Sequence, residues 1–205
     1  MPTGQGFILL ILLVVGLFYS GAIRLYPFLA QNHPQPSAEI IIIEGWLPDV
    51  ELKEAVKSIQ PGQIIVTTGG PVQFGGSLLK EKTYAEVTAA RLRLFGMADE
   101  KILCAPAPDV RCDRTYASAL AARDALKQRG FLGKSCNVYS MGAHSRRSFY
   151  LYKLAFGTEY PLGIVSIESQ ESDLRHWWRS SLAFKQVLGE LISCIYTLFS
   201  SCKYA

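Results

Sequence analysis

Four short polar segments hold the residues best suited to chemistry in this chain of 205 residues. The most distinctive is His144-Ser-Arg-Arg147, which contains one of only three histidines. The other three are Glu44, the pair Gly69-Gly70, and Asp113-Arg114-Thr115, and each stands beyond the end of an apolar run. Arginine forks bind phosphate or carboxylate, histidine exchanges protons near neutral pH, and glycine lets backbone N–H groups approach an anion. The set therefore predicts a site for an anionic ligand.

Arg146 and Arg147 stand in the first turn of a predicted helix, where the helix dipole favours negative charge. Cations are unfavourable at that end, so a negative partner is expected beside them. One explanation is a ligand phosphate or carboxylate held by Arg147, and the other is an internal carboxylate such as Glu44 or Glu86. His144 would serve as the acid or base if the domain is an enzyme, and no residue pattern decides whether it is one.

Two of the polar segments also have ordinary structural explanations. Gly69-Gly70 can cradle an anion with its N–H groups, or it can simply form a turn. Asp113 and Thr115 can each cap the helix that begins there, and Arg114 would then project at a helix N-terminus, which attracts anions. The structural and the functional explanation are both open for these residues.

Several classes of function are disfavoured by motif and by charge. The sequence has no G-x-S-x-G elbow, no phosphate-binding P-loop, no H-E-x-x-H and no G-x-G-x-x-G after a strand. No metal site is expected, because the acids near His144 are dispersed. The net charge is only +4 and the Lys and Arg residues are scattered, so no nucleic-acid-binding surface is expected.

The five cysteines show no C-x-x-C spacing. One interpretation is that they are small buried apolar side chains, since free cysteine is common in protein cores. The alternative is a Cys104–Cys112 disulfide across a proline-bearing loop, formed in an oxidising compartment. The spacing leaves both interpretations open.

Beyond residue 37, β-branched runs alternate with helical patterns. Strands are predicted at Ala38–Ile43, Gln63–Thr67, Lys101–Cys104, Asn137–Ser140 and Leu162–Ile167. Helices are predicted at Leu52–Ile59, Tyr84–Phe95, Thr115–Lys127 and Ser145–Phe156, with an amphipathic closing helix on Phe184, Val187, Leu188, Leu191, Ile195 and Leu198. This alternation predicts an α/β fold, a Rossmann-like and mainly parallel sheet with helices on both faces. Ligands bind outside the carboxyl ends of such strands, so the polar segments should share one edge.

Residues 1–30 are predicted to form a membrane anchor. Gly6–Ile23 carries no charge, and about 18 residues at a rise of about 1.5 Å reach roughly 27 Å, enough to cross a hydrocarbon core. A cleaved signal peptide is the alternative, but no Lys or Arg precedes Phe7 and the apolar run is longer than in such peptides. Residues 31–37 are predicted to be a linker, with a solvated His33, before a domain spanning residues 38–205.

Two further features concern the membrane. Arg24 is the only cation close to the apolar segment, and by the positive-inside rule it favours a cytoplasmic domain. The cluster His176-Trp-Trp-Arg179 precedes the closing helix and either packs that helix or lies at the membrane interface. Packing is the favoured interpretation.

One ordered set of motifs runs through the chain. It comprises the anchor, Thr68-Gly69-Gly70, Ala85-Glu86 opening a helix, Gly96-Met97, Arg114-Thr115, His144-Ser-Arg-Arg147, and Trp178 with Ser180 before the final helix. This order resembles the SanA/ElyC/YdcF family of bacterial envelope proteins, whose shared domain is of unknown function. The resemblance covers roughly Glu39 to Leu198. Its most specific part is the His-x-x-Arg block and its order relative to the Thr-Gly-Gly and Arg-Thr segments.

The resemblance implies a Rossmann-like fold and, for anchored members, a role in peptidoglycan or lipid-carrier metabolism. It also implies a single-pass anchor in the inner (cytoplasmic) membrane with the domain outside the cytoplasm. Arg24 favours the opposite orientation, and we adopt the one that the resemblance implies. The site candidates that it carries over are Gly69, Gly70, Glu86, Arg114, Thr115, His144 and Arg147. The sequence departs from the family at Thr115-Tyr-Ala-Ser118, where Thr-x-x-Asn is common, and at Glu44-Gly45-Trp46, where many members have Leu-Gly.

Three functions are compatible with these residues. In the first, the domain binds a small anionic or lipid-linked, phosphate-bearing precursor, with Arg114 and Arg147 on the anion, and binding is either its whole role or the start of hydrolysis or transfer of that precursor. In the second, which the soluble branch of the family implies, it binds S-adenosylmethionine or a nucleotide, with Glu44 or Glu86 on the ribose. In the third, it is a non-catalytic scaffold that recognises another envelope protein.

Overall fold

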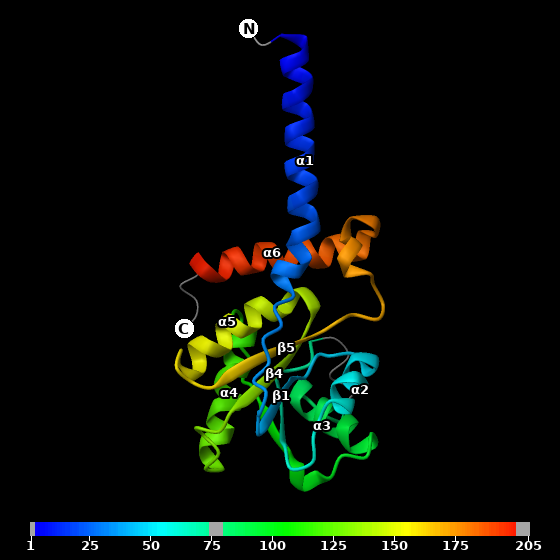
Figure 1. Ribbon diagram of the computed structural model, residues 1–205. Helices are drawn as coiled ribbons and strands as arrows, with labels where there is room; N and C mark the ends of the chain where they lie inside the picture. The colour runs from blue at the N-terminus through cyan, green and yellow to red at the C-terminus, as the bar shows by residue number, and fades with distance from the viewer. Residues whose placement is uncertain (1–2, 74–79, 200–205) are drawn as a thin grey trace.

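The computed structural model describes residues 3–73 and 80–199 of the chain. A long N-terminal helix, α1 (Gly4–Leu29), stands away from an α/β domain (Figure 1). Thr3 caps this helix, since its side-chain oxygen accepts the Gly6 N–H at 3.3 Å. Most side chains of α1 are exposed as far as Tyr19, and the helix is long and apolar enough to cross a membrane. An uncovered apolar surface of this length is what a helix in lipid requires.

The domain is built on a five-stranded parallel sheet in the order β3-β2-β1-β4-β5. The strands are β1 (Ile40–Glu44), β2 (Ile64–Gly69), β3 (Ile102–Pro106), β4 (Cys136–Met141) and β5 (Leu162–Ile167). β1 lies at the centre, and all of its residues are buried. A strand covered on both faces must be apolar nearly throughout, which explains its run of isoleucines.

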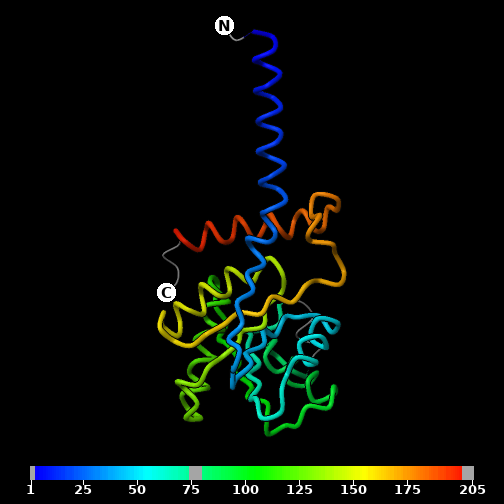
Figure 2. Tube along the Cα trace, in the orientation of Figure 1, coloured from blue at the N-terminus to red at the C-terminus, as the bar shows by residue number. Residues whose placement is uncertain are grey.

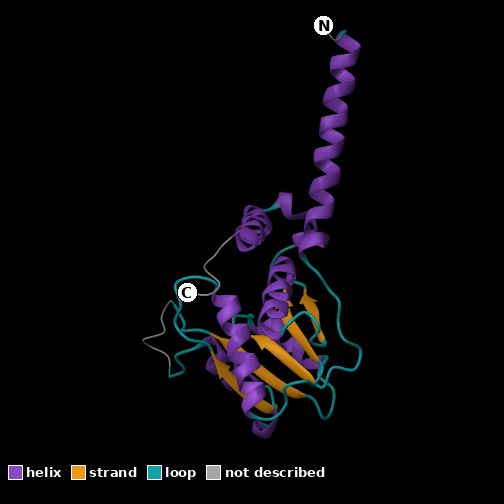
Figure 3. Ribbon diagram, turned by 90° about the vertical axis from the view of Figure 1, so that its left-hand side faces the viewer, coloured by secondary structure: helices purple, strands orange, loops and turns teal. Residues whose placement is uncertain are grey.

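Helices cover both faces of this sheet (Figure 3). The helices are α2 (Asp49–Lys57), α3 (Tyr84–Leu94), α4 (Arg114–Gln128), α5 (Ser145–Phe156) and α6 (Ser181–Phe199), with short 3-10 turns η2 (Asp99–Lys101), η3 (Gly142–His144) and η4 (Leu174–Arg179). α2 and α3 pack on Ile41 and Ile43, whereas α4 and α5 pack on Ile40 and Ile42. Successive side chains of a strand point to opposite faces, so one run of isoleucines serves both layers. The predicted Rossmann-like α/β fold is confirmed.

α6 lies across the base of α1, beside the domain, in both Figure 1 and Figure 2. By length and composition it too qualifies as a helix able to cross a membrane. Its Glu190, however, is ion-paired with Arg147 of α5 at 3.0 Å. Ala183 and Val187 of α6 are buried in a cluster with the end of α1 and with η4. These contacts hold α6 on the domain.

The predicted linker is bound to the domain along the edge strand β5. The His33 N–H donates to the Ile164 carbonyl at 2.8 Å, and the Ile164 N–H donates back to the His33 carbonyl at 3.0 Å. The Gln35 N–H donates to Asn137 Oδ1 at 2.7 Å. Gly163 lies beneath, where a Cβ would collide with the Gln35 nitrogen. The segment is therefore a strap that fixes where α1 leaves the domain, while the His33 side chain is exposed as predicted.

Candidate functional site

The strand order creates a switch point between β1 and β4. From β1 the chain winds outward through β2 to β3, then crosses back to β4 and continues to β5 on the other side. A crevice forms outside the carboxyl ends of two strands whose connections leave in opposite directions, and ligands bind there in folds of this kind. Two site candidates stand at this place, because Glu44 ends β1 and His144 closes the turn η3 directly after β4.

Glu44 and His144 face each other at the switch point. His144 Nε2 lies 3.9 Å from Glu44 Oε2, and neither atom has a hydrogen-bond partner among the described residues. Glu44 is 3% exposed and His144 is 8% exposed. A buried polar atom left without a partner costs about 1–3 kcal/mol. The pair therefore presents two polar atoms at the switch point whose hydrogen-bonding capacity is unused within the described residues, although neither residue lines any of the cavities described below.

A serine hydroxyl holds one oxygen of the Glu44 carboxylate, and further hydroxyl groups lie around it. Ser148 Oγ donates to Glu44 Oε1 at 2.7 Å, and Ser140 Oγ donates to Ser148 Oγ at 3.3 Å. Tyr152 is fully buried, and this burial, together with the negative charge of Glu44, raises the pKa of its hydroxyl well above the ordinary value. One oxygen of Glu44 is thereby fixed, and the other is left to accept a proton or a hydrogen bond.

Trp46 forms an outer wall of the site. Its ring packs edge-on against the His144 imidazole, with 5.0 Å between ring centres and an interplanar angle of 84°. Gly45 sets the turn that places it, since the Gly45 N–H donates to the Thr68 carbonyl at 2.7 Å. A Cβ at Gly45 would lie only 2.5 Å from the Tyr84 carbonyl oxygen, so glycine lets the end of β1 pass close to the start of α3.

Glu190 of α6 binds both His144 and Arg147. Its Oε1 lies 2.9 Å from His144 Nδ1, and its Oε2 accepts from Arg147 Nε at 3.0 Å. Burial acts to raise the pKa of Glu190, but hydrogen bonds and charges from His144 and Arg147 outweigh it and lower the pKa to about 2. Two groups lie 2.9 Å from His144 Nδ1, and they act in opposite directions. Glu190 Oε1 accepts and favours a proton on Nδ1, whereas Arg147 Nη2 can only donate and favours a proton on Nε2.

The negative partner expected beside the arginines is an internal carboxylate, and it is neither Glu44 nor Glu86. Arg147 pairs with Glu190 instead. Arg146 donates from Nε to the Phe28 carbonyl and lies over the Phe28 ring, 3.8 Å from its centre. The start of α5 therefore ties both the end of α1 and the middle of α6 to the domain.

Gly69 and Glu86 shape the contact between β2 and α3. Gly69 has a backbone φ of +153°, and a Cβ there would lie 2.7 Å from Tyr84 Cβ. Glu86 completes a capping box with Thr83 at the start of α3. Hydrogen bonds from the backbone and side chain of Thr83 lower the pKa of the Glu86 carboxyl. Close packing and helix capping thus account for both residues.

Gly70 and Arg114 line a cavity of about 370 Å³ outside the ends of β2 and β3. Arg114 is exposed at the first position of α4, and no ion pair within residues 3–73 and 80–199 includes it. Thr115 is half-buried beside it. Asp113 occupies the N-cap position with a left-handed φ of 50° and makes no capping hydrogen bond. An uncompensated arginine at a helix N-terminus is a suitable place for an anion.

The structure brings five of the eight site candidates together, in two groups along one edge of the sheet. Glu44, His144 and Arg147 meet at the switch point. Gly70 and Arg114 line the separate cavity at the ends of the next two strands. The two groups do not share a cavity among those found in the described parts of the chain.

Two residues of the switch-point group were not identified from the sequence. Ser148 gave no signal, because serine is common on helices. Glu190 had one signal, since it is the single acidic residue between Ser181 and Phe199 in an otherwise largely apolar helix. A lone carboxylate in such a helix must find a cation or a donor when the helix packs.

The structure excludes one of the two interpretations of the cysteines, the Cys104–Cys112 disulfide. Cys104 is free and Cys112 is disulfide-bonded, so a Cys104–Cys112 bridge is wrong. Cys104 lies inside β3, whose pairing with β2 fixes its position. Burial raises the pKa of Cys104 and of Cys136, as expected for packed thiols. Within residues 3–73 and 80–199, no three His, Cys, Asp or Glu side chains are placed to hold a metal ion.

A scan against protein-family models finds no match to the chain, and a search of curated proteins finds none either. The likeness to the SanA/ElyC/YdcF family therefore rests on the order of motifs alone.

Proposed function

We propose that this chain is a membrane-anchored protein of the cell envelope that binds an anionic, phosphate-bearing ligand at the carboxyl edge of its sheet. The observation that carries the proposal is the pair His144 and Glu44, whose facing atoms are buried without partners at the switch point. The resemblance to SanA/ElyC/YdcF proteins supports a role in peptidoglycan or lipid-carrier metabolism.

Each residue then has a distinct role. In this proposal His144 donates its Nδ1 proton to Glu190, and Nε2 takes a proton from a water or hydroxyl bound beside His144 and Glu44. Arg114 and the backbone of Gly70 hold the phosphate, because Arg147 is already neutralised by Glu190. Because the two groups line different places along the edge of the sheet, the proposal requires a ligand that reaches from Arg114 to the His144–Glu44 pair.

Two observations and the resemblance support the proposed location of the domain. α1 is suited to cross a membrane, and the strap at its end holds the domain close to the bilayer. Cys112 is disulfide-bonded, which is typical of oxidising compartments outside the cytoplasm. We therefore place the anchor in the inner membrane and the domain on its extracytoplasmic side, against the weaker inference from Arg24.

Titration calorimetry of the full chain in mild detergent with geranyl phosphate, a short lipid phosphate, tests the proposal. Arg114→Gln should weaken binding about tenfold to a hundredfold, because a hydrogen bond between charged groups contributes roughly 1.5–3 kcal/mol. Arg129→Gln is the matched control, since Arg129 follows the other end of the same helix. Equal affinity of the two variants would contradict the assignment of Arg114.

A nucleotide-type ligand such as S-adenosylmethionine is the second candidate. It is favoured by the buried Glu44 carboxylate at the switch point and by the Trp46 ring, 37% exposed, on which a base can stack. Binding of S-adenosylmethionine that Glu44→Gln abolishes, with no response to geranyl phosphate, would support this candidate. Binding of neither ligand would favour a scaffold.

A further inference from the structure

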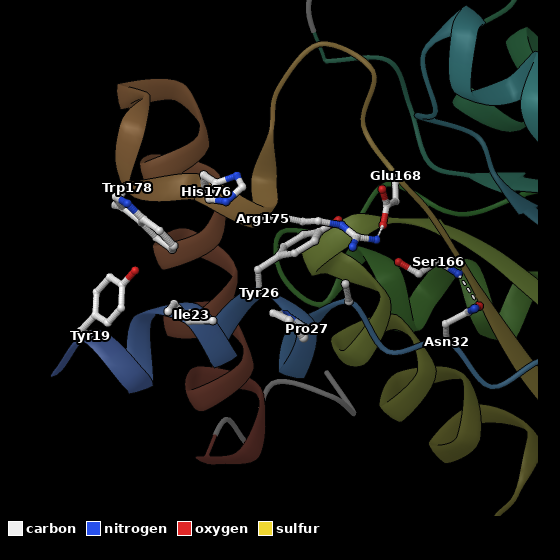
Figure 4. Close-up of a pocket in the computed structure, with 11 residues that line it drawn as sticks. Tyr19, Ile23, Tyr26, Pro27, Asn32, Ser166, Glu168, Arg175, His176 and Trp178 are labelled. Atoms are coloured by element: carbon white, nitrogen blue, oxygen red, sulfur yellow. Dashed lines mark hydrogen bonds and ion pairs between the residues drawn. The ribbon is translucent and has the colours of Figure 1, made fainter. Parts of the chain in front are cut away.

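A cavity of about 550 Å³ separates α1 from η4 (Figure 4). Its walls come from the last turns of α1, from the strap, from the end of β5 and from η4. None of the residues that line it belongs to the Glu44–His144 pair or to the Arg114 cavity. The cavity is therefore a separate feature at the junction of anchor and domain.

The polarity of the lining changes from one end of the cavity to the other, as Figure 4 shows. At one end, Tyr19 and Ile23 of α1 lie near Trp178, and the Tyr19 and Trp178 rings are 6.4 Å apart between centres. At the other end, Asn32 Oδ1 accepts the Ser166 N–H at 3.2 Å. An apolar end and a polar end in one elongated cavity match the two parts of a lipid.

The apolar end lies where α1 emerges from the predicted membrane segment. Tyr19 and Ile23 occupy the last turns of the charge-free run, and tyrosine and tryptophan gather at membrane–water interfaces. The buried Trp177 fixes η4 at this height, because its Nε1–H donates to the Ala22 carbonyl at 2.9 Å. This end of the cavity therefore adjoins the predicted membrane segment, whereas the polar end lies toward the sheet.

The polar end offers charges of both signs. Arg175 pairs with Glu168 at 2.5 Å. Both side chains are more than half exposed, so the pair is weak and can rearrange. His176 lies toward the other end, beside the Trp178 ring, as Figure 4 shows. Arg175 can then bind a phosphate through its fork, and Glu168 can bind an ammonium group.

We propose that this cavity binds one phospholipid of the surrounding bilayer, of the phosphatidylethanolamine type. Its phosphate lies on Arg175, its ammonium group lies on Glu168, and an acyl chain runs past Ile23. The bound lipid would brace α1 against η4. It would also lie next to Tyr26, whose hydroxyl is close enough to the turn η3 that a Cβ at Gly142 would approach it to 3.3 Å.

Native mass spectrometry of the full chain tests this proposal without any assay of activity. The protein is reconstituted in vesicles of phosphatidylethanolamine and phosphatidylglycerol and then extracted in mild detergent. The wild type should retain one phosphatidylethanolamine, and Arg175→Gln should lose most of it. Arg179→Gln, which removes another exposed arginine of η4 outside the lining, should retain it.

A second pair of variants tests the apolar end. Ile23→Trp fills the space for the acyl chain and should expel the lipid, whereas Leu17→Trp, on an exposed part of α1 outside the lining, should not. Absence of lipid from the wild type overturns the proposal, as does equal retention by Arg175→Gln and Arg179→Gln. If added inorganic phosphate displaces the lipid and is itself retained, the site is one for a free anion and the lipid assignment fails. These outcomes do not depend on Arg114 or His144, so they are distinct from failure of the proposed function.

Discussion

At the scale of single residues, Glu190 is the contact that orients His144. Its pKa in the fold is about 2, against about 4.3 for an unpaired glutamate. Because the folded pKa is the lower one, the stabilisation is fully present above about pH 5 and is lost as the pH falls through the window from about 4 to 2. A difference of this size corresponds to a stabilisation on the order of 2–3 kcal/mol at neutral pH.

Glu190→Gln should therefore unfold more easily than the wild type at pH 7, and the gap should narrow as the pH approaches 2.5. Urea denaturation followed by tryptophan fluorescence measures both free energies of unfolding. Glu100→Gln, in the short turn η2, is the control and should show no such narrowing. A gap between Glu190→Gln and wild type that stays constant down to pH 2.5 would show that the ion pair does not form.

We expect Glu44 to serve function without stabilising the fold. Glutamine at this position keeps an oxygen for Ser148 and removes a buried charge whose Oε2 has no partner in the described structure. We expect Glu44→Gln to leave the melting temperature unchanged or to raise it, while the response to ligand is lost. Ser148→Ala should lower the melting temperature, because it leaves Glu44 Oε1 unpaired. A clear fall in the melting temperature of Glu44→Gln would instead make Glu44 a structural residue.

The sequence predicts part of this arrangement for a definite reason. Glu44, Arg114 and His144 each follow a strand, and the carboxyl ends of parallel strands share one edge, so their common location could be inferred. The partner of Arg147 could not be inferred in the same way. Glu190 lies 43 residues further along, and its contact depends on how α6 packs against α5.

At the scale of elements, α6 is unusual in having apolar side chains on the face turned away from the domain. Its exposed apolar residues are Leu182, Phe184, Ile192, Ile195, Tyr196, Leu198 and Phe199. A helix of this kind that lies across a membrane-crossing helix is suited to the bilayer surface, with its apolar face about 5–10 Å into the interface. We expect α6 to lie flat on the membrane.

Quenching of tryptophan by brominated lipids measures the depth of α6. In reconstituted full-length protein, Ile192→Trp should be quenched more by bromine near the headgroups than by bromine near the chain ends. Leu132→Trp, exposed in the loop before β4, should not be quenched. Stronger quenching of Ile192→Trp by the deep bromines would make α6 a second transmembrane helix.

The strands and helices could be predicted because their apolar residues either form short continuous runs or recur with a helical period. Ile40–Ile43 is a run of the first kind, and the stripe of α6 has the helical period. The strap could not be predicted, because it is held mainly by backbone hydrogen bonds that have no side-chain signature. The one indication of the strap in the sequence is Gly163, because a glycine within a strand often marks the close approach of another backbone.

At the scale of the whole molecule, the end of α1, η4 and α6 gather on one side of the domain (Figure 1). We expect that side to face the membrane from outside the cytoplasm. A reporter active only outside the cytoplasm, fused to the C-terminus, should give a signal, and intact mass should show that the N-terminal helix is retained. Activity of a cytoplasm-only reporter at the same position would reverse the orientation, and a soluble form beginning near Ala22 would replace the anchor by a signal peptide.

The central claim is that a ligand group binds between His144 and Glu44. Nitrogen-15 NMR of the three imidazoles, His33, His144 and His176, tests it most directly when the full chain is titrated with geranyl phosphate. The Nε2 resonance of His144 should move on binding while those of His33 and His176 stay in place, and Glu44→Gln should abolish the movement. A saturating titration that leaves the His144 resonance unmoved would contradict the claim.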